Sequence, residues 1–257
     1  MTSTTVNSHE QEAEPQEEWT RVRRKGRRHP KAHAQAISSS DNGHSSKLKP
    51  RPSFLSLSDI EKDHQHITQQ WKSSTCCHQL REMIATRTCY PSISQAICFG
   101  LGSFDPENGL WEGRRIAHVQ LAAFLCIVEE MQRGNPQVIS CCFQEPLFNE
   151  VDRTFIRSLG HEAVDSPEGF ERVTPSTLVF GIHLYRDIYV QTMAKHSPAM
   201  FVGTPYDIWE EFSGIPSLEL AKAKKLDDQC DKIKFPQDPG YSTFSSTSIH
   251  WRRQDET

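Results

Sequence analysis

Four apolar runs recur between residues 94 and 213, and each of them ends at a turn. We interpret these runs, at 94–100, 138–143, 177–182 and 199–203, as buried strands, and a short strand is also predicted at 161–164. Helical patterns follow most of them, and this alternation predicts an α/β fold, specifically a Rossmann-like open, mostly parallel sheet with helices on both faces. Such sheets bind ligands at the carboxyl ends of their strands, where the polar residues become candidates.

Apolar residues at helical spacing predict the elements between these strands. The most regular pattern covers 115–133 and is ended by Gly134 and Pro136. Further helices are expected at 147–159, 185–194, 206–212 and 218–226. The pattern at 57–88 predicts one helix, or two if the Ser73-Ser74-Thr75 stretch interrupts it. Residues 230–240 are rich in turn formers, and the alternation at 244–251 predicts an edge strand.

The amino-terminal part of the chain has a different composition. The 257 residues are 36% hydrophobic with a mean hydropathy of -0.61, and most of the polar excess lies at the front. We therefore predict that residues 1–58 are disordered, because they cannot bury enough apolar surface to offset the entropy of ordering, and that 59–257 form the α/β domain with its core at about 94–213. No apolar stretch suits a membrane span or a secretory signal, so a soluble protein without membrane association is expected, cytoplasmic and nuclear.

Charge is segregated within that tail. An acidic block between Glu10 and Glu18 precedes a basic run whose main members are Arg21, Arg23, Arg24, Lys25, Arg27 and Arg28. Exposed positive charge on a flexible chain is typical of a nuclear import signal or of a nonspecific phosphate contact, and equally of a solvated tail. No DNA-reading motif accompanies the run, so a nucleic-acid partner is possible only through the tail.

Eight cysteines and twelve histidines offer little evidence of a metal site. No cysteine pair has the spacing that brings thiolates together on zinc, and several cysteines lie inside apolar runs. We interpret most of them as reduced, buried core residues, and we predict no metal.

Several segments, in order along the chain, resemble the SRR-like domain family, named for sensitivity to red light reduced. They are Cys98-Phe99-Gly100-Leu101-Gly102-Ser103-Phe104, Gln120-Leu121-Ala122, Gln144-Glu145-Pro146-Leu147-Phe148-Asn149-Glu150-Val151-Asp152, Ser158-Leu159-Gly160 and Thr177-Leu178-Val179-Phe180-Gly181-Ile182-His183. Outlying similarity includes Trp19-Thr20-Arg21-Val22 and Ser248-Ile249-His250-Trp251, and the chain is most similar to the fungal branch.

This resemblance implies a regulatory protein. Members of the family are associated with circadian and light signalling, haem metabolism, and cytoskeletal or developmental phenotypes, without an established shared reaction. The chain departs from the family pattern at three strand ends: Glu145-Pro146 replaces Asp-Pro, Ile182-His183 replaces Pro-His, and Gly203-Thr204 replaces Gly-Asn.

The candidate ligand-binding residues are Gly100, Gly102, Glu145, His183 and Gly203, all at predicted strand ends. Glycines allow a ligand to approach the backbone, and a carboxylate after the second strand is where dinucleotide-binding domains hold ribose hydroxyls. The third glycine of that fingerprint is missing, and the helix begins late. The alternative interpretation is a tight turn with a structural histidine.

We weigh three functions. The first is an intracellular regulatory protein that acts by binding, with a protein partner. The second is a nucleotide- or S-adenosylmethionine-dependent enzyme, in which His183 is an acid or base oriented by Glu145 or Asp105. No nucleophile elbow, phosphate loop or metal triad supports this second function. The cofactor and the catalytic residues therefore stay unassigned, and an enzyme is the less favoured class. The third is an RNA-associated factor that uses the basic tail.

Overall fold

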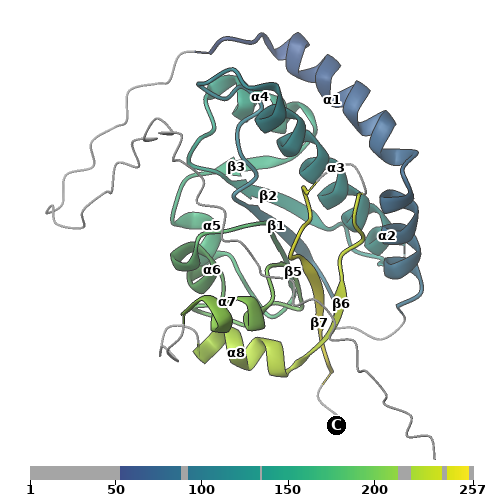
Figure 1. Ribbon diagram of the computed structural model, residues 1–257, viewed down its shortest axis with the longest axis vertical. Helices are drawn as coiled ribbons and strands as arrows, with labels where there is room; N and C mark the ends of the chain where they lie inside the picture. Colours follow the sequence, from purple (N-terminus) through teal and green to yellow (C-terminus); the bar gives the residue numbers. More distant parts are fainter. Residues whose placement is uncertain (1–52, 88–91, 134, 214–220, 239–241, 255–257) are drawn as a thin grey trace, which may run out of the picture. The chain divides into compact units, whose positions relative to one another are not determined.

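The sheet determines the architecture of the domain. The computed structural model describes residues 53–87, 92–133, 135–213, 221–238 and 242–254. In these ranges lie β1 (Gln95–Phe99), β2 (Ser140–Gln144), β3 (Glu162–Val164), β4 (Thr177–Gly181), β5 (Met200–Gly203), β6 (Cys230–Lys234) and β7 (Ser248–Arg252), in the order β3-β2-β1-β4-β5-β7-β6. Strands β1 to β5 pair in parallel, whereas β7 is antiparallel to β5 and β6 (Figure 1). The predicted mostly parallel α/β sheet is confirmed.

Helices cover both faces of the sheet, as the alternating pattern predicted. They are α1 (Leu57–Lys72), α2 (Thr75–Ala85), α3 (Trp111–Arg133), α4 (Glu150–Ser158), α5 (Glu168–Glu171), α6 (Arg186–Thr192), α7 (Tyr206–Ser213) and α8 (Ala221–Asp228). Helices α1 to α4 pack on one face and α5 to α8 on the other (Figure 1). The first helical region is two helices, because Ser73 ends α1 and the Ser74 hydroxyl caps α2 by accepting from the Cys77 amide.

The end of the chain differs from the prediction. Strand β7 is not an edge strand, since it lies between β5 and β6 with Ile249 and Trp251 only 0% and 1% exposed. The edge is β6, which lies in the segment that the sequence marked as turn-rich. Its residues Cys-Asp-Lys-Ile-Lys show only a weak strand pattern. Pairing with β7, and not local propensity, therefore determines this strand.

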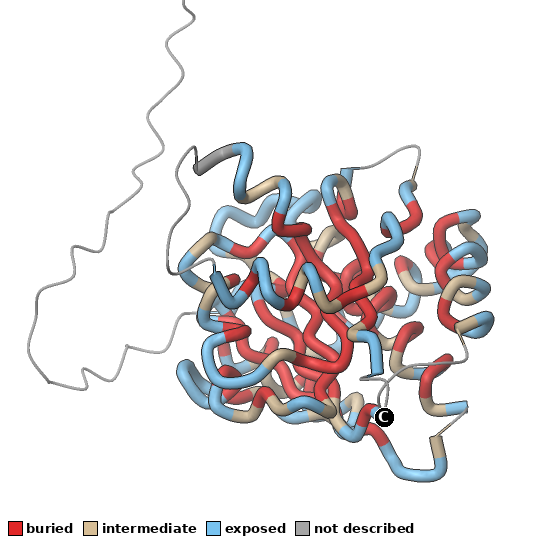
Figure 2. The backbone as a smooth tube through the Cα atoms, turned by 90° about the horizontal axis from the view of Figure 1, so that it is seen from below, coloured by how far each residue is buried: buried red, intermediate tan, exposed pale blue. Residues whose placement is uncertain are grey.

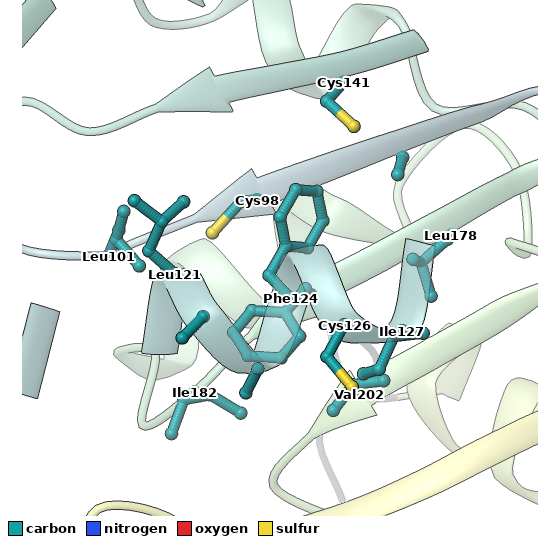
Figure 3. Close-up of a cluster of buried hydrophobic side chains, with 14 of the residues drawn as sticks. Cys98, Leu101, Leu121, Phe124, Cys126, Ile127, Cys141, Leu178, Ile182 and Val202 are labelled. Carbon is teal, nitrogen blue, oxygen red and sulfur yellow. The ribbon is translucent and has the colours of Figure 1, made fainter. Parts of the chain in front are cut away.

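Core side chains alternate between the two faces along each strand, as a buried sheet requires. In β1, Ala96 and Cys98 belong to the cluster under α1 to α4, whereas Ile97 and Phe99 belong to the cluster under α5 to α8. Buried positions accordingly concentrate along the strands and the inward sides of the helices (Figure 2). On the first face, Leu121 and Phe124 of α3 point towards Cys98 of β1 (Figure 3).

The cysteines are part of this core. All seven in the described ranges are free and buried, namely Cys76, Cys77, Cys98, Cys126, Cys141, Cys142 and Cys230. Burial raises the pKa of the Cys76 and Cys141 thiols to about 12, because a thiolate is costly in an apolar environment. The interpretation of these cysteines as buried core residues is confirmed.

The predicted amino-terminal tail is mostly outside the described residues. Residues 1–52, with the basic run from Arg21 to Arg28, lie there, so the prediction of disorder and the role of that run stay predictions. The described chain begins at Ser53, and α1 begins at Leu57. Residues 53–58 therefore belong with the domain and not with the tail.

Candidate functional site at the carboxyl edge of the sheet

The turn after β1 requires glycine at two positions. Gly100 and Gly102 have φ values of +68° and +82°, a region that side chains with a Cβ atom seldom adopt. The Gly100 amide donates to the Gln144 carbonyl at the end of β2 (3.3 Å between N and O), which continues the pairing of β1 and β2 into the turn. This geometry places Gly102 directly above the end of β2.

Glu145 meets that turn, as the sequence predicted. Its Oε2 atom accepts a hydrogen bond from the Gly102 amide and its Oε1 atom accepts one from the Leu147 amide, both at 2.8 Å. The side chain is 6% exposed. Each carboxylate oxygen has a second lone pair, so these two bonds leave Glu145 able to accept from a ligand hydroxyl. Its observed role is to hold the glycine turn.

Leu184 occupies the crevice between β1 and β4. The strand order reverses at these two neighbours, and in open α/β sheets ligands bind outside the strand ends at such a reversal. A Cβ atom added to Gly100 would lie 2.6 Å from Leu184 Cδ2, and one added to Gly181 would lie 2.4 Å from Leu184 Cδ1. Leu184 is 7% exposed. The glycines at this point therefore accommodate a side chain of the protein itself.

His183 points away from the glycine turn. Its φ of +52° is unusual for a residue other than glycine, and its Nε2 atom donates to the Ser245 carbonyl oxygen at 2.8 Å. Within the described part of the chain, the hydrogen bonds of His183 go to Ser245 and not to Glu145 or Asp105. The orienting role considered for those two carboxylates is therefore not observed. His183 is exposed and joins the loop before β7 to the end of β4.

Gly203 is a packing residue. It is the register partner of Gly181 on β4, and a Cβ atom at Gly203 would lie 2.5 Å from the Gly181 carbonyl oxygen and 2.6 Å from Phe201 Cζ. The five predicted residues thus share the carboxyl edge of the sheet but fall into two groups. Gly100, Gly102 and Glu145 lie in or beside the turn after β1, whereas His183 and Gly203 lie at the ends of β4 and β5.

A cleft of about 620 Å³ opens on the β5 to β6 side of this edge. Its walls come from the start of α7, the end of β6 and the start of β7; they include Pro205, Asp207, Ile208, Lys232, Ile233, Lys234, Phe235, Gln237, Ser246, Thr247 and Ser248. The residue before Ser246 is the Ser245 that accepts from His183. Lys232 donates to Asp227 Oδ2 at 2.6 Å, and this bond raises the pKa of the Lys232 ammonium, which therefore stays charged.

This cleft was not predicted from the sequence. The segments that form it come from separate parts of the chain, and nothing in their composition marks a site. The available signals were the Thr204-Pro205 helix start and the serine and threonine residues before β7. Both are also common in ordinary turns and caps.

A buried polar network anchors the loop between β1 and α3. Asp152, which is 0% exposed, accepts from the Ser103 hydroxyl (2.7 Å), the Phe104 amide (3.0 Å) and the Asn149 amide (3.0 Å). Asp105 accepts from Asn149 Nδ2 at 3.1 Å and from two residues ahead of α1. The Asn-Glu-Val-Asp segment in the family resemblance therefore caps α4 and also fixes the β1 loop.

Two histidines, the buried His118 and the half-buried His64, form a second feature away from the sheet edge. The rings of His64 on α1 and His118 on α3 have centroids 5.5 Å apart and pack with Phe104 and Phe155. Neither ring nitrogen of His118 has a hydrogen-bond partner among the residues that the structure describes, and burial lowers its pKa to about 3. Burial also lowers the pKa of His64 to about 4. In the described ranges, no three histidine, cysteine or acidic side chains gather in a way that could hold a metal ion.

The fold defines an α/β protein of the doubly wound type, extended at one edge by the β7 and β6 strands. The family model of the SRR1 domain matches residues 64–251, and the chain belongs to that family. The resemblance seen in the sequence is confirmed. No curated protein matches the chain.

Two solved structures are similar in arrangement. One is the crystal structure of Thermoplasma acidophilum 1320, at 7% identity and a TM-score of 0.34, covering 72% of this chain and 100% of that one. Another is the SAH-bound methyltransferase PaMTH1 of Podospora anserina, at 11% identity and a TM-score of 0.32, covering 80% and 100%. At these TM-scores neither structure bears on function. No described helix combines the length and the apolar character that a bilayer crossing requires.

Proposed function

We propose that this protein is an intracellular regulatory protein that works by binding a protein partner, and that the cleft beside β6 is the binding surface. The observation that carries this proposal is the cleft itself, which lies at the carboxyl edge where open α/β sheets bind ligands. At the strand-order reversal of the same edge, where sheets of this type bind cofactors, the Leu184 side chain packs against Gly100 and Gly181. Binding to a partner therefore suits the accessible part of this edge better than catalysis with a cofactor.

The cleft adjoins an edge strand, which favours an extended peptide as the occupant. Within the described residues β6 pairs only with β7, so its outer edge presents backbone groups that a peptide strand can pair with. Ile233 on β6 is 42% exposed and offers an apolar contact, whereas the neighbouring Lys232 points to the other face of the strand and pairs with Asp227. The matching segment of a partner carries an apolar side chain that contacts Ile233.

Substitution of Ile233 tests this proposal. We expect Ile233→Glu to remove partners of the full chain, because it replaces the exposed apolar contact with a charge that is costly to bury against a partner. The measurement is proximity labelling in cells that produce the tagged chain, with partners quantified against the wild type. Val138→Glu is the matched control, since Val138 is 84% exposed and precedes β2 at the opposite edge of the sheet. An identical partner list for Ile233→Glu and Val138→Glu would refute the assignment of the cleft.

The second candidate is a nucleotide- or S-adenosylmethionine-dependent enzyme. It is favoured by the bond between Gly102 and Glu145, which places a carboxylate beside a glycine turn at the ends of β1 and β2. This function requires Leu184 to leave the crevice. Leu184→Ala should then strengthen the binding of S-adenosylhomocysteine or an adenine nucleotide, because the closed conformation lowers the apparent affinity. Calorimetric titration that finds no binding to the wild type or to Leu184→Ala would eliminate this candidate.

The basic run provides a localisation proposal for the full chain. We propose that residues 19–31, which include Arg23, Arg24 and Lys25, direct part of the protein to the nucleus. Deletion of 19–31 should abolish nuclear enrichment of a fluorescently tagged chain. An unchanged distribution between cytoplasm and nucleus would contradict the proposal.

The same run is the basis of the third candidate, an RNA-associated factor. Contacts between its cations and phosphates would make RNA affinity fall steeply with salt concentration. Fluorescence anisotropy with a short single-stranded RNA, recorded at rising salt, checks this. Absent or salt-insensitive binding removes the candidate.

A further inference from the structure

The segment ahead of α1 makes two hydrogen bonds to one buried carboxylate of the domain, and its Leu55 side chain packs against the core. The Ser53 hydroxyl donates to Asp105 Oδ2 at 3.0 Å, and the Phe54 amide donates to the same oxygen at 2.8 Å. Asp105 is 2% exposed, whereas Ser53 and Phe54 are exposed. A hydroxyl at the surface is thus a direct partner of an acidic group in the interior.

The same oxygen links this anchor to the loop that bears the glycine turn. Asn149 Nδ2 also donates to Asp105 Oδ2, at 3.1 Å, and the Asp105 amide donates to the Ser103 hydroxyl at 2.9 Å. Ser103 in turn donates to the fully buried Asp152. A change of charge at Ser53 therefore acts on the network that positions the loop after β1.

We propose that Ser53 is a phosphorylation site and that its phosphorylation detaches Ser53 and Phe54 from Asp105. A phosphoserine carries close to two negative charges near neutral pH and has no hydroxyl proton to donate. At the position of Ser53 it faces a carboxylate that is already buried, so like-charge repulsion replaces a hydrogen bond. Ser53 and Phe54 then separate from Asp105, whereas the packing of Leu55 against the core does not depend on this charge.

The neighbouring sequence suits a protein kinase as the modifying enzyme. Lys47, Lys49 and Arg51 precede Ser53, and positive charge close to the acceptor complements a kinase with an acidic substrate groove. Ser53 lies outside α1 in a segment without regular structure, which an extended-chain binding groove can accommodate. In the reaction, the Ser53 Oγ attacks the γ-phosphorus of ATP held by the kinase. The bond to the β,γ-bridging oxygen breaks, ADP leaves, and the hydroxyl proton passes to the catalytic base of the kinase.

Ser58 provides an internal control for this proposal. It lies in the first turn of α1, where a negative charge is favourable at the positive end of the helix dipole. Phosphate at Ser58 should therefore preserve or strengthen α1. Phosphate at Ser53, which lies ahead of the helix, should loosen its beginning and the β1 loop.

Phosphoserine installed by genetic code expansion at position 53 or 58 of the full chain tests the structural effect. Hydrogen exchange should speed up about ten-fold or more at residues 54–60 and at 103–105 for phosphoserine 53, because local opening becomes easier. Phosphoserine 58 and Ser53→Ala should change the exchange at 103–105 far less. Equal exchange in the phosphoserine 53 and wild-type chains would overturn the proposal.

Whether Ser53 is phosphorylated in cells is tested on the full chain isolated from them. Phosphopeptide mass spectrometry of the full chain, purified with phosphatase inhibitors, should find phosphate on Ser53. Recovery of the unmodified Ser53 peptide alone, across growth conditions that alter the phosphorylation of other proteins, would also overturn the proposal.

Discussion

The carboxylate of Glu145 accepts a hydrogen bond from the backbone amide of Gly102 at 2.8 Å, joining the ends of β2 and β1. The two residues are 43 positions apart in sequence and meet because β1 and β2 are parallel neighbours. A pair that resembles a ribose-binding arrangement is thus also a structural clamp on the glycine turn. Effects of Glu145 substitutions on stability and on binding must therefore be measured separately.

Replacement of Glu145 by glutamine should destabilise the domain. The glutamine side chain can accept from only one of the two amides and presents an NH₂ group to the other, so a partly buried N–H loses its charged partner. We expect the free energy of unfolding to fall by about 1–3 kcal/mol, measured by urea denaturation. The Gly102 amide signal should shift in NMR spectra. Unchanged stability together with an unchanged Gly102 signal would show that the hydrogen bonds accepted by Glu145 do not stabilise the domain.

A double-mutant cycle tests the packing of Leu184 in the crevice. Gly181→Ala should cost about 1–3 kcal/mol because the new methyl group overlaps Leu184 Cδ1 and Cγ. In the Leu184→Ala background that cost should largely disappear, giving a coupling energy within the range of about 0.5–3 kcal/mol seen for residues in contact.

Gly102→Ala is the control for that cycle. No described atom lies within 4 Å of the added Cβ, but the φ of +82° strains any residue other than glycine. Its cost should therefore be the same in the wild-type chain and in the Leu184→Ala background. Additive costs for Gly181→Ala and Leu184→Ala would show that the crevice is not filled as described.

Stability should fall as the pH is lowered below about 6.5. Burial lowers the pKa of His118 to about 3 and of His64 to about 4, so both stay neutral in the folded state while the unfolded chain takes up protons. The stability associated with these depressed pKa values is therefore complete above the unfolded pKa of about 6.5 and is lost progressively towards pH 4. Each histidine contributes at most about 1.4 kcal/mol per pH unit in that window.

His118→Phe should flatten this dependence between pH 6.5 and 4, since a phenylalanine ring suits the contacts with Phe104 and Phe155 and takes up no proton. Urea midpoints at pH 7 and pH 5 measure the difference. His66→Phe, on the exposed side of α1, should keep the wild-type slope. Parallel pH profiles for the wild type and His118→Phe would contradict the prediction.

Removal of the Trp251 side chain should be severely destabilising. Trp251 lies on β7 in the interior of the sheet and is 1% exposed, so Trp251→Ala leaves a large cavity and should cost about 3–5 kcal/mol. Thermal and urea unfolding measure this loss. Trp111→Ala, at a position that is 45% exposed, should cost much less. Equal losses for the two variants would be inconsistent with an inner β7.

Local patterns were sufficient for the parallel half of the fold. The apolar runs at 94–100, 177–182 and 199–203 predicted β1, β4 and β5, because a strand buried on both faces needs apolar side chains at successive positions. The amphipathic stripe of α3 was equally clear, although the helix begins at Trp111, four residues before the predicted start. Glycine after β1 and a carboxylate after β2 likewise predicted that Gly102 and Glu145 meet, since parallel strand ends share one edge.

Tertiary structure alone decided the remaining features. The sequence by itself could not place Leu184 in the crevice, direct His183 to Ser245, or insert β7 between β5 and β6, because each depends on which distant segments pack together. The cleft has the same origin, as its walls come from two strands and a helix that carry no shared pattern. The sequence determined the layered α/β fold through periodic burial of side chains, which is a local property. Which side chains meet at the carboxyl edge of the sheet depended on contacts between segments far apart in the sequence. The local spacing of apolar residues does not specify such contacts.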